Sequence, residues 1–337
     1  MSMDLHGRKI VVTGGAGFIG SELVRQLADK GATVEVADNL VNGKVENLVG
    51  VIGDQVSLNV VDVRDVIAMR KLLEGADLVY HLACLGVRHS IHDPLENHEV
   101  NATATLALLG EAQKTGIERF VYVSTSEVYG TARFAPMSEE HPTFPHTVYG
   151  SSKLAGESYT HAYYDTFGLE SVVIRPFNAF GPRCHHEGDS GEVIPKFMVR
   201  CLADQPMVVF GDGSQTRDFT FVSDTAHGIA LAGIAERAVG ETINLGRGEE
   251  ITILELANAV KSTLGKDDAG VEFDAPRPGD VLRLLADSTK AANLLGYVPK
   301  VGFHEGLENL AAWYSRQNKS AEDLLADEIR HNWEVNG

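Results

Sequence analysis

The chain is poor in cysteine and has no long apolar run, and each absence excludes a class of protein. Its three cysteines, Cys84, Cys184 and Cys201, have no metal-ligand spacing and cannot all pair. They therefore indicate reduced thiols in a cytoplasmic setting. No apolar run reaches the about 18 residues of a membrane span, and the N-terminus shows no signal-peptide pattern. We expect a globular protein that stays where it is made.

Basic residues are also under-represented, with 29 Lys and Arg against 47 Asp and Glu in 337 residues, a formal charge of −18. Such a field repels polyanions and argues against nucleic acid or an anionic membrane as a general partner. Any anionic ligand must then be held by a few placed arginines. A metal site is not expected either, because no further ligands stand at a supporting spacing near His185 and His186.

The order of apolar segments predicts an α/β fold. Six short apolar runs alternate with helix-length segments between about residues 8 and 175, which is typical of βαβ units and a mostly parallel sheet. These runs are "KIVVTG", "ATVEVAD", "VSLNVVD", "DLVYHLA", "RFVYVST" and "SVVIRP". After Pro176 the chain becomes irregular and rich in Gly, Pro and charge, which indicates a smaller second lobe. We expect a doubly wound Rossmann-type domain over 1–175, with about 219–246 returning to it, and an α/β substrate lobe over 176–218 and 247–337.

The segment "KIVVTGGAGFIGSELVRQLADKGATVEVADN" predicts a dinucleotide site. It reads as strand, glycine-rich turn, amphipathic helix and second strand, and Gly14, Gly17 and Gly20 stand at the expected spacing. Glycine is needed where the chain reverses, where the backbone approaches a pyrophosphate and where the helix meets the strand. Asp38 ends the second strand, where it would accept hydrogen bonds from a ribose and repel a 2′-phosphate. NAD is therefore favoured over NADP.

Further cofactor contacts are expected along the ends of the following strands. Asp62, after the third strand, either contacts the adenine or caps the helix of "VRDVIAMRKLL". The full set of expected cofactor-binding residues is Gly14, Gly17, Phe18, Ile19, Gly20, Asp38, Asn39, Asp62, Val63, Leu82, Ala83, Tyr149, Lys153 and Pro176.

Tyr149 and Lys153 form the candidate catalytic pair. They stand at i and i+4 of a predicted helix and so share one face. An ammonium near a phenol lowers the pKa of the phenol, which suits Tyr149 to take a proton from a hydroxyl during hydride transfer.

Nearly the whole sequence resembles the extended short-chain dehydrogenases/reductases that modify nucleotide sugars. The resemblance rests on "TGGAGFIGS", "VVDVRD", "HLA", "STSEVYG", "YGSSK", "RPFNAFGPR", "GDGSQTRDFTFVSD", "NLG" and "RPGD". It implies NAD in the N-terminal domain, a sugar nucleotide in the second lobe and oxidation of the sugar at C4. Non-catalytic NAD sensing is a contrasting hypothesis, which the intact Tyr149, Lys153, Thr125 and Glu127 oppose.

The resemblance also implies residue roles. Thr125 would bond the C4 oxygen, Tyr149 would act as base and Lys153 would position the nicotinamide ribose. The substrate contacts are expected from Arg88, Asn178, Val193, Arg217, Arg277 and Asp280. For Arg217 and Arg277 a diphosphate needs permanent cations with forked donors, and surface ion pairing is the alternative. Cys84 is expected to be a small buried thiol rather than a redox group.

Ser126 and Glu127 carry the finer expectation. In this family, an acid at the position of Glu127 accompanies chemistry at C5 of the sugar. The alternative is that Glu127 is an exposed carboxylate at a strand end, with no role in the reaction. A dehydratase would use a second acid at the position of Ser126, and a decarboxylase must accept a carboxylate there. Loss of CO2 from UDP-glucuronic acid is therefore favoured, with Arg277 as the carboxylate partner or a proton relay. The loop "LGVRHSIHDPLENHEVN" and "GEVIPKF" resemble 4-epimerases instead, so epimerisation and 4,6-dehydration stay open.

The resemblance further suggests a homodimer. The segments "ENHEVNATATLALLGEAQKTG" and "SSKLAGESYTHAYYDTFG" offer apolar residues for the sheet and for a partner. The equivalent family helices often form a four-helix bundle between two subunits.

Overall fold

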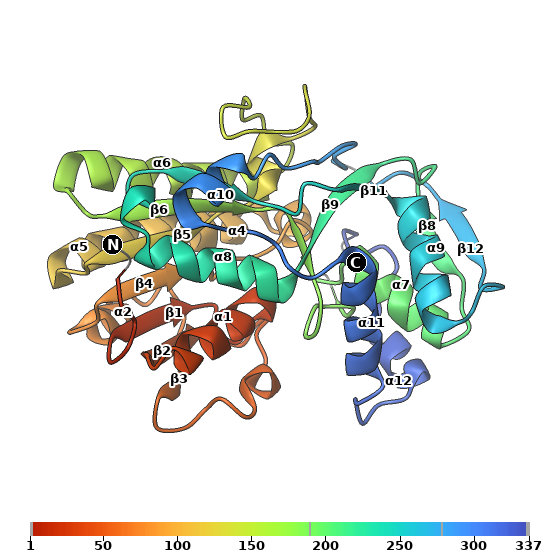
Figure 1. Cartoon of the computed structure of the whole chain (residues 1–337), viewed down its shortest axis with the longest axis horizontal. Coiled ribbons are helices and arrows are strands. Elements are labelled where there is room, and N and C mark those ends of the chain that lie inside the picture. The colour runs from red at the N-terminus through yellow and green to blue at the C-terminus, as the bar shows by residue number, and fades with distance from the viewer. Residues whose placement is uncertain (1–2, 189, 278, 335–337) are drawn as a thin grey trace.

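A parallel sheet of seven strands organises the N-terminal part of the computed structural model, which describes residues 3–188, 190–277 and 279–334. The strand order is β10-β6-β5-β4-β1-β2-β3, and every neighbouring pair is parallel (Figure 1). The strands are β1 (Lys9–Thr13), β2 (Thr33–Asp38), β3 (Val56–Val60), β4 (Leu78–His81), β5 (Arg119–Val123), β6 (Ser171–Pro176) and β10 (Thr242–Leu245). The six apolar runs thus form β1 to β6, and the predicted fold class is confirmed.

Helices cover both faces of this sheet because alternate strand residues point to opposite sides. On one face, Ile10, Val12 and Tyr80 join a core with α1 (Phe18–Asp29), α8 (Val222–Ile234) and α10 (Thr289–Leu295). On the other, Val11 and Phe120 pack with α2 (Val66–Leu73), α5 (Ala104–Thr115) and α6 (Val148–Phe167). The turns α3 (His89–His92) and α4 (Pro94–His98) lead through the π-helical turn Glu99–Thr103 into α5.

The second part of the chain has its own core (Figure 1, right). One small sheet has the order β11-β9-β7, and a two-stranded sheet pairs β12 with β8. The strands are β7 (Asn178–Phe180), β8 (Met207–Phe210), β9 (Thr216–Phe221), β11 (Glu250–Thr252) and β12 (Val271–Asp274). The helices are α7 (Val193–Leu202), α9 (Ile253–Leu264), α11 (Phe303–Tyr314) and α12 (Ala321–Ala326).

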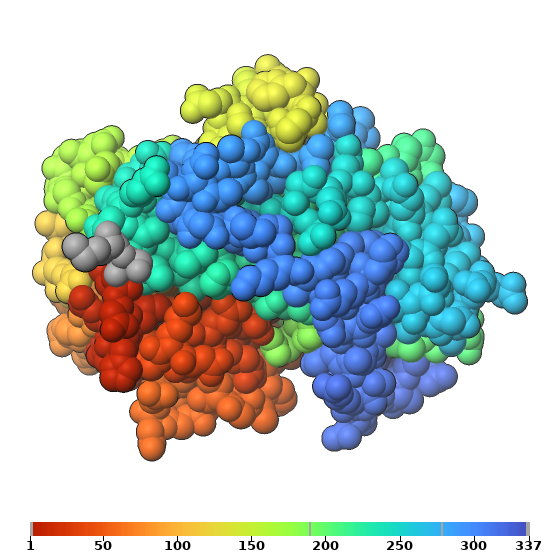
Figure 2. Space-filling view, in the orientation of Figure 1, coloured from red at the N-terminus to blue at the C-terminus, as the bar shows by residue number. Residues whose placement is uncertain are grey.

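The chain crosses between the two parts more than once. After β9 it returns to the large sheet with α8 and β10, and later α10 packs on the same face. Figure 2 shows the segment around α10 (blue) running across the front toward α11. The division at 175, 218 and 246 stays a prediction. Within the described residues, no helix combines the length and apolar character of a membrane span.

Candidate active site

A cleft of about 490 Å³ lies at the carboxyl ends of the parallel strands and extends to the second part of the chain. Its volume falls in the range of small-molecule sites, and this edge of a doubly wound sheet is where such folds bind ligands. The cleft is lined by every predicted cofactor and substrate residue except Asp62 and Lys153. Segments far apart in sequence therefore meet in one place.

The glycine turn forms a cradle that no larger residue could fill. Gly14 has φ of +70°, and a Cβ there would lie 2.7 Å from the Ala83 nitrogen. A Cβ on Gly20 would lie 2.1 Å from the Gly14 carbonyl oxygen. The N-cap residue of α1 is Gly17, so no side chain accepts a hydrogen bond from the first N–H groups of the helix. The first turn of α1 also contains no acid. The N–H groups of this helix end suit a pyrophosphate, so the residues fit the expected dinucleotide.

The two predicted strand-end acids differ in their surroundings. Asp38 is buried at the cleft, and its carboxylate accepts hydrogen bonds from Ala16 N and Leu40 N, both at 2.9 Å. Burial raises the pKa of Asp38. Asp62 instead bonds Arg64 and Asn39, and these bonds lower its pKa to about 2. The alternative helix cap is wrong for Asp62, because Asp65 caps α2 by accepting from Ala68 N at 3.0 Å.

Tyr149 lies in the first turn of α6, whose start is fixed by Thr147. The Thr147 hydroxyl accepts a hydrogen bond from Gly150 N at 3.1 Å. Lys153 follows one turn later, is fully buried, and donates through Nζ to the Val123 carbonyl at 2.7 Å. Its ammonium also lies 4.3 Å from the centroid of the Tyr122 ring. Lys153 thus holds α6 against the end of β5.

The expected lowering of the Tyr149 pKa is not found. Burial raises the pKa of the phenol well above its ordinary value, and the nearby Cys84 and Glu127 add to the rise. Burial lowers the pKa of Lys153 as well. The reason is that desolvation disfavours both charged forms, and it outweighs the attraction that the i, i+4 spacing suggested.

Thr125, Ser126 and Glu127 lie where β5 ends and a 3₁₀ turn, Ser126–Tyr129, begins. The Thr125 hydroxyl accepts a hydrogen bond from Glu127 N at 3.2 Å, and Thr125 and Ser126 are buried. Glu127 is half-buried and faces the cleft, so it is no idle strand end in water. Burial raises its pKa, although Arg217 and Arg277 pull in the opposite direction. Its carboxyl is therefore placed to exchange a proton with a ligand.

The predicted substrate residues that lie in the second part of the chain also line the cleft. Arg217 and Arg277 both donate to Asp280 Oδ1, at 2.8 and 2.6 Å. Burial lowers the pKa of Arg217. The ion pairing weighed as an alternative exists, but it lies in the cleft rather than on an open surface. Asn178 Oδ1 is buried there and has no hydrogen-bond partner among the described residues, and Val193 also lines the cleft.

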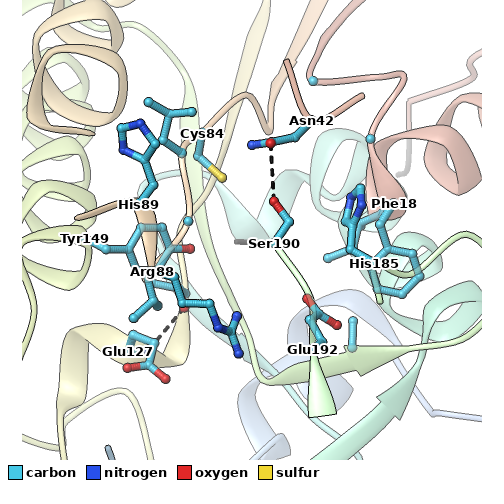
Figure 3. A pocket seen from close by; sticks show the side chains of 18 of the residues that line it. Phe18, Asn42, Cys84, Arg88, His89, Glu127, Tyr149, His185, Ser190 and Glu192 are labelled. Atoms are coloured by element: carbon cyan, nitrogen blue, oxygen red, sulfur yellow. Dashed lines mark hydrogen bonds between the residues drawn. The ribbon is translucent and has the colours of Figure 1, made fainter. Parts of the chain in front are cut away.

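Two cleft residues differ from the sequence predictions: Glu192 was not predicted, and Cys84 was predicted to be buried. Glu192 projects into the cleft across from Arg88 and Glu127 (Figure 3). It directly precedes the predicted Val193, and an acid at the edge of a predicted site was the only signal available. Cys84, expected to be buried, is exposed and lines the cleft beside Tyr149, whereas the next residue, Leu85, is buried in the core.

Two contacts join the loop after β2 to the loop before α7. Lys44 pairs with Glu187, and Asn42 and Ser190 are joined at 3.3 Å (Figure 3). Glu187 also accepts from His185 Nδ1 at 2.9 Å and approaches His186 Nδ1 at 3.1 Å. In the part of the chain that is described, no three side chains form a metal-binding group.

Comparison with known proteins identifies relatives along almost the whole chain. The family model for GDP-mannose 4,6 dehydratase matches residues 11–310. UDP-glucuronic acid decarboxylase 2 of Arabidopsis thaliana is 38% identical over 313 residues, which cover 91% of this chain and 68% of the relative.

Solved structures agree in fold and differ in reaction. An epimerase from Methanothermobacter thermautotrophicus superposes with a TM-score of 0.88 at 36% identity, covering 92% of this chain and 93% of that one. The dTDP-glucose 4,6-dehydratase DesIV from Streptomyces venezuelae, solved with NAD bound, gives a TM-score of 0.85 at 34% identity, with 91% and 97% covered. Three reactions are thus represented at similar distance.

Proposed function

Because the chain belongs to the GDP-mannose 4,6-dehydratase family of NAD-dependent nucleotide-sugar enzymes, we propose that it decarboxylates UDP-glucuronic acid. The product would be a UDP-4-keto-pentose, UDP-xylose or both. One observation carries the choice of chemistry at C5. Glu127, with a raised pKa, faces the same cleft as Thr125 and Tyr149.

The glycine turn and Asp38 would hold NAD, and the α1 N-terminus would face its pyrophosphate. NAD held there would supply the hydride-transfer chemistry that oxidises the sugar and can reduce it again. Asp38 favours two free ribose hydroxyls, since a 2′-phosphate would meet its carboxylate.

The side chains of the cleft can perform the remaining steps. Tyr149, whose pKa is raised by burial, must first lose its own proton to act as the base that takes the proton of the C4 hydroxyl as that carbon is oxidised, and Thr125 holds the same oxygen. The 4-ketone makes the sugar a β-keto acid, so the C5–C6 bond breaks and CO2 leaves its electron pair in an enolate. Thr125 and Tyr149 stabilise the enolate oxygen. Glu127 then gives its proton to C5.

Epimerisation at C4 is the second candidate. It needs Thr125 and Tyr149 but no acid at C5, and the loop that carries Arg88 together with "GEVIPKF" resembles 4-epimerases. Dehydration across C5 and C6 is the third. Ser126 speaks against it, whereas Glu192 supplies a second carboxyl from another element of the cleft. Either reaction would use the same NAD site.

The test is to incubate the purified protein with NAD and UDP-glucuronic acid and to follow CO2 and the sugar products by NMR. We expect CO2 release that Tyr149→Phe abolishes and that Glu127→Gln slows by about 10²- to 10⁴-fold. UDP-galacturonic acid without CO2 would refute decarboxylation and support the epimerase. Turnover unaffected by Tyr149→Phe would refute the assigned chemistry.

We also propose that the enzyme works in the cytoplasm as a homodimer, assembled through α5 and α6 as a four-helix bundle. The three reduced cysteines and the apolar residues on these helices support this proposal.

A further inference from the structure

Arg88 differs from the other arginines of the cleft because no carboxylate of the described residues holds it. It lies in the loop that follows β4, and its guanidinium points into the cleft between Glu127 and Glu192 (Figure 3). Its Nε is buried without a hydrogen-bond partner, and no carboxylate of the described residues lies within ion-pair distance of it. Arg217 and Arg277, by contrast, both donate to Asp280.

Among the described acids, Glu192 and Glu127 act most strongly on Arg88, and both are equally unpaired. Within the described residues, neither Glu127 nor Glu192 forms an ion pair, and burial raises the pKa of both carboxyl groups. Both nevertheless act on Arg88: burial and Arg277 lower its pKa to about 10, while Glu192 and Glu127 oppose this shift. A cation and two acids thus share the cleft without direct contact. Charged groups left unpaired in a partly buried site are costly unless a ligand completes them.

From this arrangement we infer that Arg88 is the receptor for the C6 carboxylate of the sugar, an inference that rests on the proposed uronate substrate. A guanidinium binds a carboxylate through two parallel hydrogen bonds, and the Nε of Arg88 is not engaged by any of the described residues. Arg277, which the sequence analysis favoured for this role, is already engaged by Asp280.

The neighbourhood of Arg88 agrees with this assignment. C6 is attached to C5, so its receptor must lie near the group that protonates C5, and Arg88 acts electrostatically on Glu127. Arg217 and Arg277 act more strongly on Glu127 than Arg88 does, but both donate to Asp280, and Arg217 also donates to the Thr216 carbonyl at 2.8 Å. Arg217 and Arg277 are then left for the diphosphate.

Glu192 is the specificity-determining partner of Arg88. Its carboxyl faces the same space, and its ionised form repels an incoming carboxylate, which restrains the binding of uronates and leaves uncharged sugars unaffected. Removal of the two side chains should therefore change selectivity in opposite directions, an outcome that a merely structural role would not produce.

The experiment measures binding to the NAD-loaded Tyr149→Phe protein, which prevents turnover. Calorimetry with UDP-glucuronic acid, UDP-glucose and UDP is performed on this background and with Arg88→Gln, Arg88→Lys or Glu192→Gln added. Arg88→Gln should weaken UDP-glucuronic acid by about 10- to 100-fold more than UDP-glucose. Arg88→Lys should restore part of this difference, and Glu192→Gln should shift selectivity toward UDP-glucuronic acid.

Equal losses for all three ligands in Arg88→Gln would overturn the inference and assign Arg88 to the diphosphate. Unchanged selectivity in Glu192→Gln would overturn the role of that residue. Should Arg88→Gln lose its fold, judged by NAD binding and thermal unfolding, Arg88→Lys and Glu192→Gln still decide the question.

Failure of the inference can be told apart from failure of the proposed function. If the native enzyme releases no CO2 yet Arg88 still discriminates the uronate, decarboxylation is wrong and the carboxylate receptor stands. If CO2 is released while Arg88→Gln leaves the selectivity unchanged, the reaction stands and the receptor is refuted.

Discussion

Glu127 is a carboxyl group on which burial and charge act in opposite directions, and the balance predicts a pH dependence. Burial raises its pKa more than the surrounding arginines lower it. As a proton donor to C5 it must be protonated, so kcat for CO2 release should fall as the pH rises through this raised pKa. The pH profile of kcat should lose this descending limb in Glu127→Gln.

Glu139 provides a matched control for this measurement. Burial also raises its pKa, but it accepts a hydrogen bond from Asn244 N and does not line the cleft. Glu139→Gln should keep the descending limb. A limb that survives in Glu127→Gln would contradict the role of Glu127 as the acid.

Gly20 lies in the glycine-rich turn at a position with no room for a side chain. A Cβ at this position would lie 2.1 Å from the Gly14 oxygen and 2.9 Å from the Gly15 Cα, and both are backbone atoms. Gly20→Ala should therefore cost about 1–3 kcal/mol of unfolding free energy and weaken NAD binding. Urea unfolding and NAD titration measure the two effects. Gly53→Ala, where a Cβ meets nothing within 4 Å, should change neither.

The element that carries the catalytic pair, α6, is anchored by a buried ionic network. Arg175 of β6 donates to both Glu157 oxygens at 2.9 and 2.6 Å and to the Tyr129 hydroxyl at 2.8 Å. Glu157 lies one turn after Lys153. Arg175→Met would leave the Glu157 carboxylate buried and unpaired, which should lower the unfolding free energy by about 3–5 kcal/mol.

A double replacement tests this anchor. Arg175→Met with Glu157→Met removes both charges together and should recover much of the stability measured by urea unfolding. Additive losses in the double variant would show that the pair itself contributes nothing.

At the level of elements, periodicity predicted most of what the structure shows. Apolar runs became β1 to β6 because strands buried on both faces need continuous apolar residues. Helix starts were less predictable, since both Asp62 and Asp65 could cap α2 and only the local backbone selects Asp65. Glu192 and the exposed Cys84 lie in irregular loops, whose course depends on tertiary packing and leaves no period in the sequence. The motif predicted that Arg277 belongs to the site. It could not reveal that Asp280 already binds the Arg277 guanidinium.

Across the whole molecule, the arginines of the cleft carry a charge opposite in sign to the net charge of the chain. A chain of formal charge −18 places Arg88, Arg217 and Arg277 in one cleft. The overall field repels anionic ligands at long range, so binding of a sugar nucleotide must rely on contacts formed inside the cleft, where salt screens less.

The outer side of α4 and α5 supports the last prediction, which concerns assembly. Leu95 is 69% exposed and Leu106 is 39% exposed. They are eleven residues apart in an almost continuous helical stretch, so they lie on one face about three turns apart. Phe167, at the end of α6, is 56% exposed. Apolar side chains gathered on helices that pack against one another fit a second copy of the same chain.

Light scattering at micromolar concentration should give a dimer, and Leu95→Glu with Leu106→Glu should give a folded monomer. Val298→Glu, at a site 64% exposed outside these helices, should leave the dimer intact. A monomeric native protein, or a dimer that tolerates both charges, would place the interface elsewhere.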